Sequence, residues 1–223
     1  MGACVGADWS PVFCKQHVYP TQVAPILRRS TQHAAHSERA AQMEVLPAHF
    51  GLLTAMASDL SYGAKNVNAS SEKVANEPRF NRQWIKGQRC IIPVKAIYEP
   101  DWRTGEYVPC RITRVDGETM GVAGLWQRWT CPDKEPLNSF TMLTVNADDH
   151  HIFKHLHRSN PKRSADKQNK RMVVILKSED YDGWLDAKLE NAMDYMRQYP
   201  SEDLLAVSEP KELLQAHSLN LPN

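Results

Sequence analysis

Residues 89–99 of this chain read RCIIPVKAIYE, and they are the best starting point for its interpretation. The segment is rich in β-branched residues, which favour strands. We expect an apolar strand over Cys90–Tyr98 that ends in the carboxylate of Glu99. A carboxylate at the end of such a strand, close to Trp102, is partly shielded from water, as a proton-transfer group often is.

The segments that follow continue the strand pattern. Val108–Val115 alternates up to the turn Asp116-Gly117, and Met120–Trp126 resumes after it, which predicts a β-hairpin. Two further apolar segments predict strands, Phe140–Val145 and Met172–Leu176. Residues 1–30 predict extended chain with a strand, and the polar residues 31–43 predict a loop.

Helical spacing is confined to a few segments. Glu72–Lys86 has apolar residues at near-helical intervals, with Ser70 or Ser71 as a cap and Gly87 as a stop. Pro78 is expected to divide this helix into two short pieces. Three late segments also predict helix, namely Asp180–Leu185, Leu189–Tyr199 and Pro210–His217. Many strands with few helices indicate an α+β fold, mainly an antiparallel sheet that is barrel-like with peripheral helices.

Length and composition limit the class of protein. With 223 residues, the chain is long enough for one well-buried domain and short for two, so we expect one domain over 1–223. Lys and Arg number 27 against 26 Asp and Glu, so a nucleic-acid surface has to be a local patch. The five cysteines form neither an even set nor a CxxC pair, which argues against a disulfide framework and a zinc site. Without an apolar span or a signal peptide, we expect a soluble, cytoplasmic monomer.

One segment differs from the rest in its charge. Lys154–Arg171 contains seven Lys or Arg residues and two histidines against the single acid Asp166. It has no hydrophobic period after Leu156, which predicts a loop. The loop is either a solvated surface of incidental charge or a local phosphate-binding patch, in which each neutralised phosphate releases counterions.

Seven segments in order resemble the SRAP family (SOS response-associated peptidase), whose domains cap abasic sites in single-stranded DNA by a covalent bond from a cysteine. They are spread across most of the chain: Val18–Gln22, Phe50–Leu52, Asn68–Phe80, Arg89–Glu99, Ala123–Trp129, Ser139–Thr144 and Arg171–Leu176. The resemblance implies that single-stranded DNA with abasic sites is the partner, on the nucleoid when bound, and that no cofactor or metal takes part.

The nucleophile of the family is a cysteine that becomes the first residue when Met1 is removed. Its amine forms a Schiff base with the sugar aldehyde, and its thiol closes a thiazolidine. This chain begins Met1-Gly2-Ala3-Cys4, so removal of Met1 exposes Gly2. The counterpart is Cys4, which is either the active thiol or an ordinary buried cysteine. With its amine blocked, the Cys4 thiol forms only a reversible hemithioacetal.

Asn68 matches the asparagine that holds the captured sugar in the family. On sequence alone, an Asn before a helix is more often a turn or cap residue. Two residues later the family has an arginine that contacts a phosphate, whereas this chain has Ser70. Lys65, Lys73 or the basic loop would then have to replace that contact.

Glu99 matches the catalytic glutamate of the family, although Pro100 follows it in place of an aromatic residue. His157, followed by the basic residue Arg158, matches the histidine of the family, which relays a proton. In typical members the apolar strand follows almost at once, whereas here Ser159–Asn169 intervenes. His155 is therefore the alternative counterpart.

The remaining candidates concern the path of the DNA strand. Trp102 is the best candidate for stacking an exposed base, whereas Trp84 and Trp126 lie in apolar runs and predict core positions. DNA contacts from the loop are expected of four basic residues, Arg158, Lys162, Arg163 and Lys167.

The leading hypothesis is an abasic-site sensor that crosslinks to single-stranded DNA in the DNA damage response. Two alternatives stay open. One is an autoproteolytic cysteine peptidase, in which Cys4 and Glu99 cleave the N-terminus of the chain itself. The other is a diverged module that binds DNA or a partner without crosslinking, which the replacement at Ser70 favours.

Overall fold

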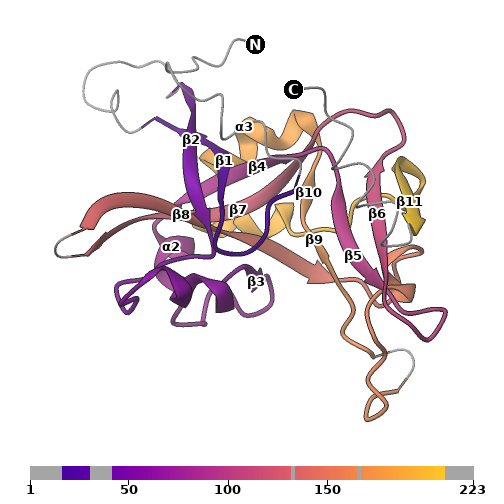
Figure 1. The fold of residues 1–223 in the computed structure, drawn as a ribbon. Helices are drawn as coiled ribbons and strands as arrows, with labels where there is room; N and C mark the ends of the chain where they lie inside the picture. The colour runs from indigo at the N-terminus through magenta and orange to yellow at the C-terminus, as the bar shows by residue number, and fades with distance from the viewer. Residues whose placement is uncertain (1–16, 31–41, 132–133, 165–166, 209–223) are drawn as a thin grey trace, which may run out of the picture.

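The computed structural model describes residues 17–30, 42–131, 134–164 and 167–208 (Figure 1). Among these residues, five strands close into a barrel in the order β7-β4-β1-β2-β8, with β7 and β8 paired to complete the ring. All neighbours in the ring are antiparallel except β2 and β8. The five are β1 (Val23–Arg29), β2 (Met43–Phe50), β4 (Arg89–Val94), β7 (Met120–Cys131) and β8 (Lys134–Asn146). The predicted barrel-like α+β fold is confirmed.

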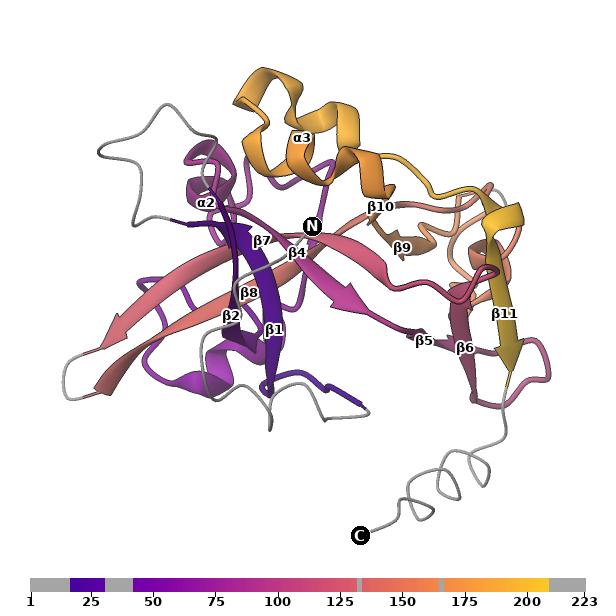
Figure 2. The same cartoon turned by 90° about the horizontal axis from the view of Figure 1, so that it is seen from above.

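Short strands extend the barrel, and a separate sheet lies beside it. β3 (Asn68–Ser70) and β9 (Arg171–Val173) pair with β8, and β10 (Ile175–Leu176) pairs with β7. The separate sheet has the order β11-β6-β5 among the described residues. Figure 2 shows this sheet, made of β5 (Ile97–Asp101), β6 (Val108–Arg114) and β11 (Leu204–Ser208), set apart from the barrel.

The strand predicted over Cys90–Tyr98 is two strands. A bend at Lys95 ends β4 in the barrel and starts β5 in the separate sheet, so Glu99 lies in the middle of β5 and not at a strand end. The chain has to turn here because β4 and β5 take different partners, β7 and β6. An unbroken run of β-branched residues does not reveal such a change of sheet.

The hairpin predicted around Asp116-Gly117 is wrong. The turn exists, with Gly117 at φ 74°, but β6 pairs with β5 and β11 whereas β7 pairs with β4, β8 and β10. Alternation predicts strands but not their partners. At Gly124 a β-carbon would lie 2.5 Å from Ile92 Cδ1, so close packing against β4 is part of what places β7 in the barrel.

The helices are fewer and shorter than predicted. Glu72–Lys86 forms turns and then the short helix α2 (Asn81–Ile85), which begins after Phe80 without a side-chain cap, so neither Ser70 nor Ser71 caps it. Pro78 begins the second of two turn segments, 71–76 and 78–80, and α2 follows directly, so the segment is divided near Pro78 as expected. Gly87, at φ 64°, follows its end as predicted.

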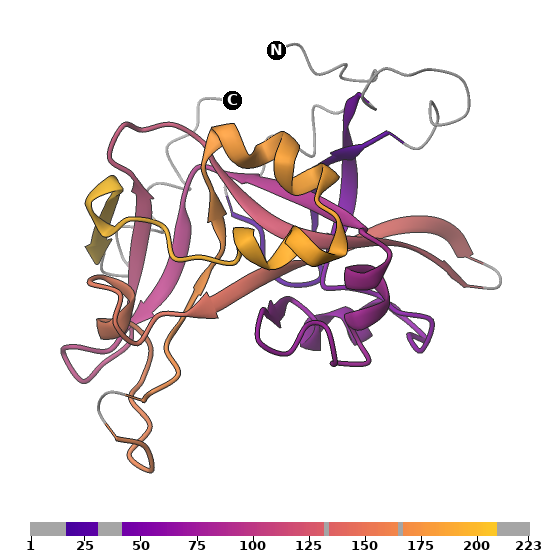
Figure 3. The ribbon, with the colours of Figure 1, turned by 180° about the vertical axis from the view of Figure 1, so that it is seen from behind.

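The late helical segments are confirmed in part. α3 (Tyr181–Asp186) agrees with the prediction, whereas Leu189–Tyr195 is the 3₁₀ helix η4. Both lie on one side of the barrel (Figure 3). Pro210–His217, most of the 31–43 loop and Cys4 lie outside the described residues. The other 3₁₀ helices are η1 (Leu60–Lys65), η2 (Phe153–His155), η3 (Ser178–Asp180) and η5 (Ser201–Asp203).

The core joins the barrel to its covering helices. Trp84 of α2 and Trp184 of α3 are buried, their rings 6.4 Å apart, and Trp184 Nε1 donates a hydrogen bond of 3.0 Å to the carbonyl of Cys90. Trp126 is partly buried against the same core and is covered by the Arg28 guanidinium. Among the described residues, no helix has the length and apolar character to cross a bilayer.

Candidate active site

Glu99 and His157 meet at the outer edge of the separate sheet. The Oε2 atom of Glu99 lies 3.1 Å from Nε2 of His157, and the two side chains are 16% and 35% exposed. Nε2 itself is shielded from solvent, but the ring is not aligned to form a regular hydrogen bond with the carboxylate. The arrangement is a close contact between an acid and a base, within reach of a group that enters from solvent.

Backbone contacts bring His157 to Glu99. Leu156 forms an isolated antiparallel bridge with Asp101, and the His157 N–H donates a hydrogen bond of 2.7 Å to the Pro100 carbonyl. Pro100 lacks an N–H, which suits the outer edge of a short sheet. His157 has φ 60°, a left-handed conformation that few residues other than glycine adopt. The local backbone therefore orients this histidine, despite the long insertion that follows it.

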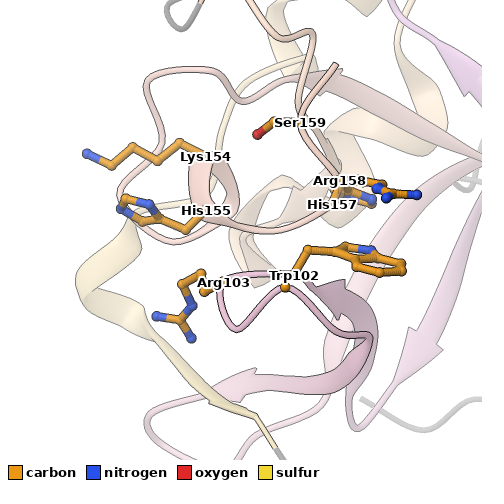
Figure 4. A pocket seen from close by; sticks show the side chains of 8 residues that line it. Trp102, Arg103, Lys154, His155, His157, Arg158 and Ser159 are labelled. Atoms are coloured by element: carbon orange, nitrogen blue, oxygen red, sulfur yellow. The ribbon is translucent and has the colours of Figure 1, made fainter. Parts of the chain in front are cut away.

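A basic pocket of about 440 Å³ adjoins this pair. Figure 4 shows Trp102 and Arg158 on one flank of it, with Lys154 and His155 on the opposite flank. The Arg158 guanidinium lies 5.2 Å from the centre of the Trp102 ring, and Tyr107 packs edge-on against the same ring. Arg103, Gly105 and Ser159 complete the lining. The pocket combines an aromatic face with several cations.

His155 lines the pocket but does not pair with Glu99. Desolvation lowers the pKa of His155, and the nearby charges of Lys154 and Arg103 lower it further. Of the two histidines that the sequence left open, His157 is the one in contact with Glu99. His155 is a neutral imidazole among cations near pH 7, which suits a hydrogen bond to an anion.

Asp101 anchors the turn that carries Trp102. It is buried, accepts hydrogen bonds from the amide and guanidinium of Arg103, and accepts one of 2.6 Å from Ser208 Oγ. The Arg103 guanidinium is the main cause that holds the pKa of Asp101 well below its usual range. These contacts join β5, the Trp102 turn and β11 into one unit.

Asn68 lies on β3, where its register partner is Met142 of β8. Its side chain is exposed, and within the described residues no hydrogen bond or ion pair joins it to Glu99 or His157. The structure therefore assembles the acid and the histidine, whereas Asn68 stands on another strand with its side chain available to solvent.

Arg171 occupies the surroundings of Ser70. Its guanidinium makes two contacts with Glu72, of 2.8 and 2.9 Å, and one of 3.4 Å with Ser70 Oγ. Burial raises the pKa of Glu72, but hydrogen bonds from Arg171 and Ser70 outweigh it and lower that pKa to about 2. Ser70 stands where the family has an arginine, and the Arg171 guanidinium lies beside it. This guanidinium is already paired with the Glu72 carboxylate.

The other predicted DNA contacts are surface residues. Lys65 and Lys73 are exposed near β3, and Lys162, Arg163, Lys167 and Arg158 are exposed on the basic loop. Lys65 lines a smaller pocket of about 320 Å³ with Tyr62 and Arg79. Arg163 Nη1 donates to the carbonyl of Gln168, so part of the loop is organised by its own hydrogen bonds.

The two described free cysteines, Cys90 and Cys110, are both buried. Burial raises the pKa of both thiols, and that of Cys90 lies far above its usual range. Cys110 lies directly across from Glu99 in the register of β5 and β6. Neither is a thiolate near neutral pH, so neither is suited to act as a nucleophile. Among the described residues, no cluster of His, Cys, Asp or Glu side chains is arranged to hold a metal ion.

Several residues of the site were not predicted from the sequence. Asp101 and Arg103 flank Trp102, and only their adjacency to it hinted at a role. Lys170 and Arg171 lie where the strand β9 begins, and the only local pattern that marks them is this pair of basic residues before apolar ones. Their partners are separated from them in sequence, so no local pattern reveals the contacts.

The chain is similar to two proteins of Bacillus subtilis. The abasic site processing protein YoqW of Bacillus subtilis is 28% identical over an alignment of length 185, and the match covers 75% of each chain. YoaM, another abasic site processing protein of the same organism, is 28% identical over an alignment of length 186, and the match covers 76% of this chain and 74% of that one.

Solved structures are also similar. A Bordetella bronchiseptica protein has a TM-score of 0.73 and 35% identity, with 86% of each chain covered. A Bacteroides thetaiotaomicron protein has a TM-score of 0.67 at 20% identity, with 87% of this chain and 77% of that one covered, which is a likeness of fold alone. The profile of the SOS response associated peptidase (SRAP) family matches residues 8–213, a range that starts after Cys4. Because this match spans most of the chain, the protein belongs to the SRAP family.

Proposed function

We propose that this protein captures abasic sites in single-stranded DNA through a covalent bond from Cys4, with Glu99 and His157 moving the protons. The abasic site processing proteins to which the chain is similar support a role at such lesions. The observation that carries the proposal is the 3.1 Å contact of Glu99 and His157 beside a basic, aromatic pocket. We treat the chain as one domain that acts as a monomer in the cytoplasm.

The chemistry requires an aldehyde, a nucleophile and a proton shuttle. An abasic sugar equilibrates with a ring-opened aldehyde, and a free Cys4 amine would add to it and lose water to give a Schiff base. The Cys4 thiol then adds to the imine carbon and closes a thiazolidine. In this proposal Glu99 protonates the oxygen that leaves, and His157 exchanges that proton with solvent; the 3.1 Å contact of the two side chains supports these roles.

The pocket provides a path for the flanking DNA. Trp102 is half-buried, with one face toward Arg158, and offers a surface for a base next to the lesion, where stacking contributes roughly 1–3 kcal/mol. Lys154 and Arg158 supply charge for the adjoining phosphates. Asn68, which is exposed on β3, would hold the sugar. The exposed residues Lys65, Lys73, Lys162, Arg163 and Lys167 would extend the contacts along the backbone.

The test is adduct formation with defined protein termini. Two forms of the protein, one that begins at Met1 and one trimmed to Cys4, are verified by intact mass and incubated with single-stranded DNA with or without an abasic site. We expect a band that resists denaturant only from the trimmed form with abasic DNA. Cys4→Ser should abolish this band, and Cys14→Ser, a matched control at a second N-terminal cysteine, should leave it.

The outcomes separate the alternatives. No adduct from a verified Cys4 terminus overturns the crosslinking proposal and favours a binding module without crosslinking. Spontaneous loss of Met1 to Ala3 from the full chain, absent in Glu99→Gln, would favour autoproteolysis as a step that precedes capture. An adduct that persists in Cys4→Ser and disappears in Cys14→Ser would move the nucleophile to Cys14.

A further inference from the structure

We propose that Lys170 is a positioning residue that holds His157 against Glu99. Its side chain is only 5% exposed, although lysine is among the residues most rarely buried. The Nζ atom donates two hydrogen bonds of 2.7 Å, one to the carbonyl of Leu156 and one to the carbonyl of His157. The Lys170 ammonium therefore binds the backbone of the turn that carries His157.

The lysine completes a set of contacts around that turn. On one side the His157 N–H donates to the Pro100 carbonyl, and on the other the His157 carbonyl accepts from Lys170. The peptide units on both sides of this left-handed residue are thus held, one by β5 and one by the ammonium. A single non-glycine residue at φ 60° persists when its surroundings impose the conformation, and these contacts do so.

The backbone of Lys170 is itself fixed. Asp148 accepts hydrogen bonds from the amides of Asn169 and Lys170, of 3.0 and 2.7 Å. Asn169, like His157, has φ 60°. Two left-handed residues therefore bracket residues 158–168, and Lys170 ties the two ends of that segment together. The insertion closes on itself at its base, which explains how the histidine stays in place although the next strand is delayed.

The electrostatics agree with a role beyond packing. Burial lowers the pKa of Lys170, and the charge of Asp148 offsets this only in part. No carboxylate of the described residues lies within ion-pair distance of Nζ; its two hydrogen-bond partners are carbonyls. A methionine would fill the same space without desolvating a charge, so the ammonium is better explained by the two carbonyls that it holds.

This role rests on the proposed function, since His157 matters only if it transfers protons. The test uses the full chain, trimmed to Cys4, with Lys170→Met, the rescue variant Lys170→Arg and the control Lys177→Met, which removes an exposed ammonium after β10. Two readouts are measured, the adduct rate at saturating abasic DNA and amide hydrogen exchange of peptides that cover 153–157.

We expect Lys170→Met to lower the rate at saturation roughly tenfold to a hundredfold, because small displacements of a catalytic group have effects of this size. Affinity for undamaged DNA should stay within about twofold, exchange at 153–157 should rise, and Lys170→Arg should recover most of both. Lys177→Met should match the unmodified protein in every readout. If the unmodified protein forms no adduct, the proposed function fails and hydrogen exchange alone decides the role of Lys170.

Two results would overturn the proposal. One is a normal rate and normal exchange in Lys170→Met. The other is exchange that rises equally throughout the barrel, with a rate loss that Lys170→Arg does not recover, which would make Lys170 a general stability residue.

Discussion

The Glu99–His157 side of the site and the Asn68 side are built in different ways. Glu99 and His157 are in direct contact, and hydrogen bonds to Pro100 and Lys170 hold the histidine turn. Asn68 is an exposed residue of a three-residue strand whose side chain has no recorded partner in the described part of the chain. The proposed proton-transfer half is therefore held in place by the fold, whereas the proposed sugar-holding half is an exposed side chain.

We therefore expect the two halves to contribute different free energies to the proposed reaction. A pre-organised acid and base lower the barrier of the chemical step. A single exposed amide adds one hydrogen bond to a bound sugar, with a net contribution of about 0.5–1.5 kcal/mol. The predictions below probe this contrast.

The largest effect is expected from Glu99→Gln. The substitution keeps the shape of the side chain and deletes its titrating proton, so the adduct rate should fall by roughly two to four orders of magnitude. DNA affinity should hardly change, because one carboxylate contributes little to phosphate binding. Adduct rate, affinity and melting temperature are measured on one preparation. A folded Glu99→Gln protein with a normal rate would remove Glu99 from the mechanism.

Asp101→Asn should mainly affect stability on the same side. The buried carboxylate accepts charge-assisted bonds from Arg103, so its loss should lower the free energy of unfolding by about 1–3 kcal/mol. Because the pKa of Asp101 is depressed in the folded state, its contribution is present above its unfolded pKa of about 4 and is lost as pH falls below it. Urea titrations at pH 7 and pH 3 measure this.

The control for Asp101 is Asp116→Asn, which removes an exposed carboxylate paired with Arg114. Its effect on unfolding at pH 7 should be much smaller. Equal effects from the two variants would contradict the view that Asp101 anchors the Trp102 turn.

Asn68→Ala should have a smaller effect on the adduct rate than Glu99→Gln, about tenfold, which corresponds to one lost hydrogen bond. The melting temperature should not change, because the side chain is exposed and has no partner to lose. Rate against DNA concentration, with a melting curve, tests both points. A rate loss as large as that of Glu99→Gln would show that the two halves of the site contribute equally.

The smallest effect is expected from the basic loop. Replacing Lys162, Arg163 and Lys167 by Gln should flatten the slope of log affinity for undamaged single strands against log salt by about 2 units if all three contact phosphates. The matched control replaces the exposed lysines Lys86, Lys177 and Lys188 by Gln. Equal slopes in the two triple variants would show that the basic residues of the loop are solvated surface charges that do not contact phosphates.

The sequence predicted the parts of this site more successfully than their assembly. The strands of the barrel were visible in runs such as Phe140–Val145, because strand preference and alternation are local. The sequence did not reveal that the chain changes sheets at Lys95, nor that β5, β6 and β11 form a separate sheet, because no local pattern specifies which strands pair. His157 was left in competition with His155 for the same reason. The hydrogen bonds that decide between them come from Pro100 and Lys170, which are distant in sequence.

The central claim is that Glu99 and His157 act as one unit, and a double-mutant cycle tests it most directly. Adduct rates at saturating abasic DNA are measured for the protein trimmed to Cys4 and for Glu99→Gln, His157→Asn and the double variant. Residues that act together are strongly non-additive, so the double variant should be no slower than the slower single variant. Losses that multiply in the double variant would mean that the two residues act independently, and would contradict the claim.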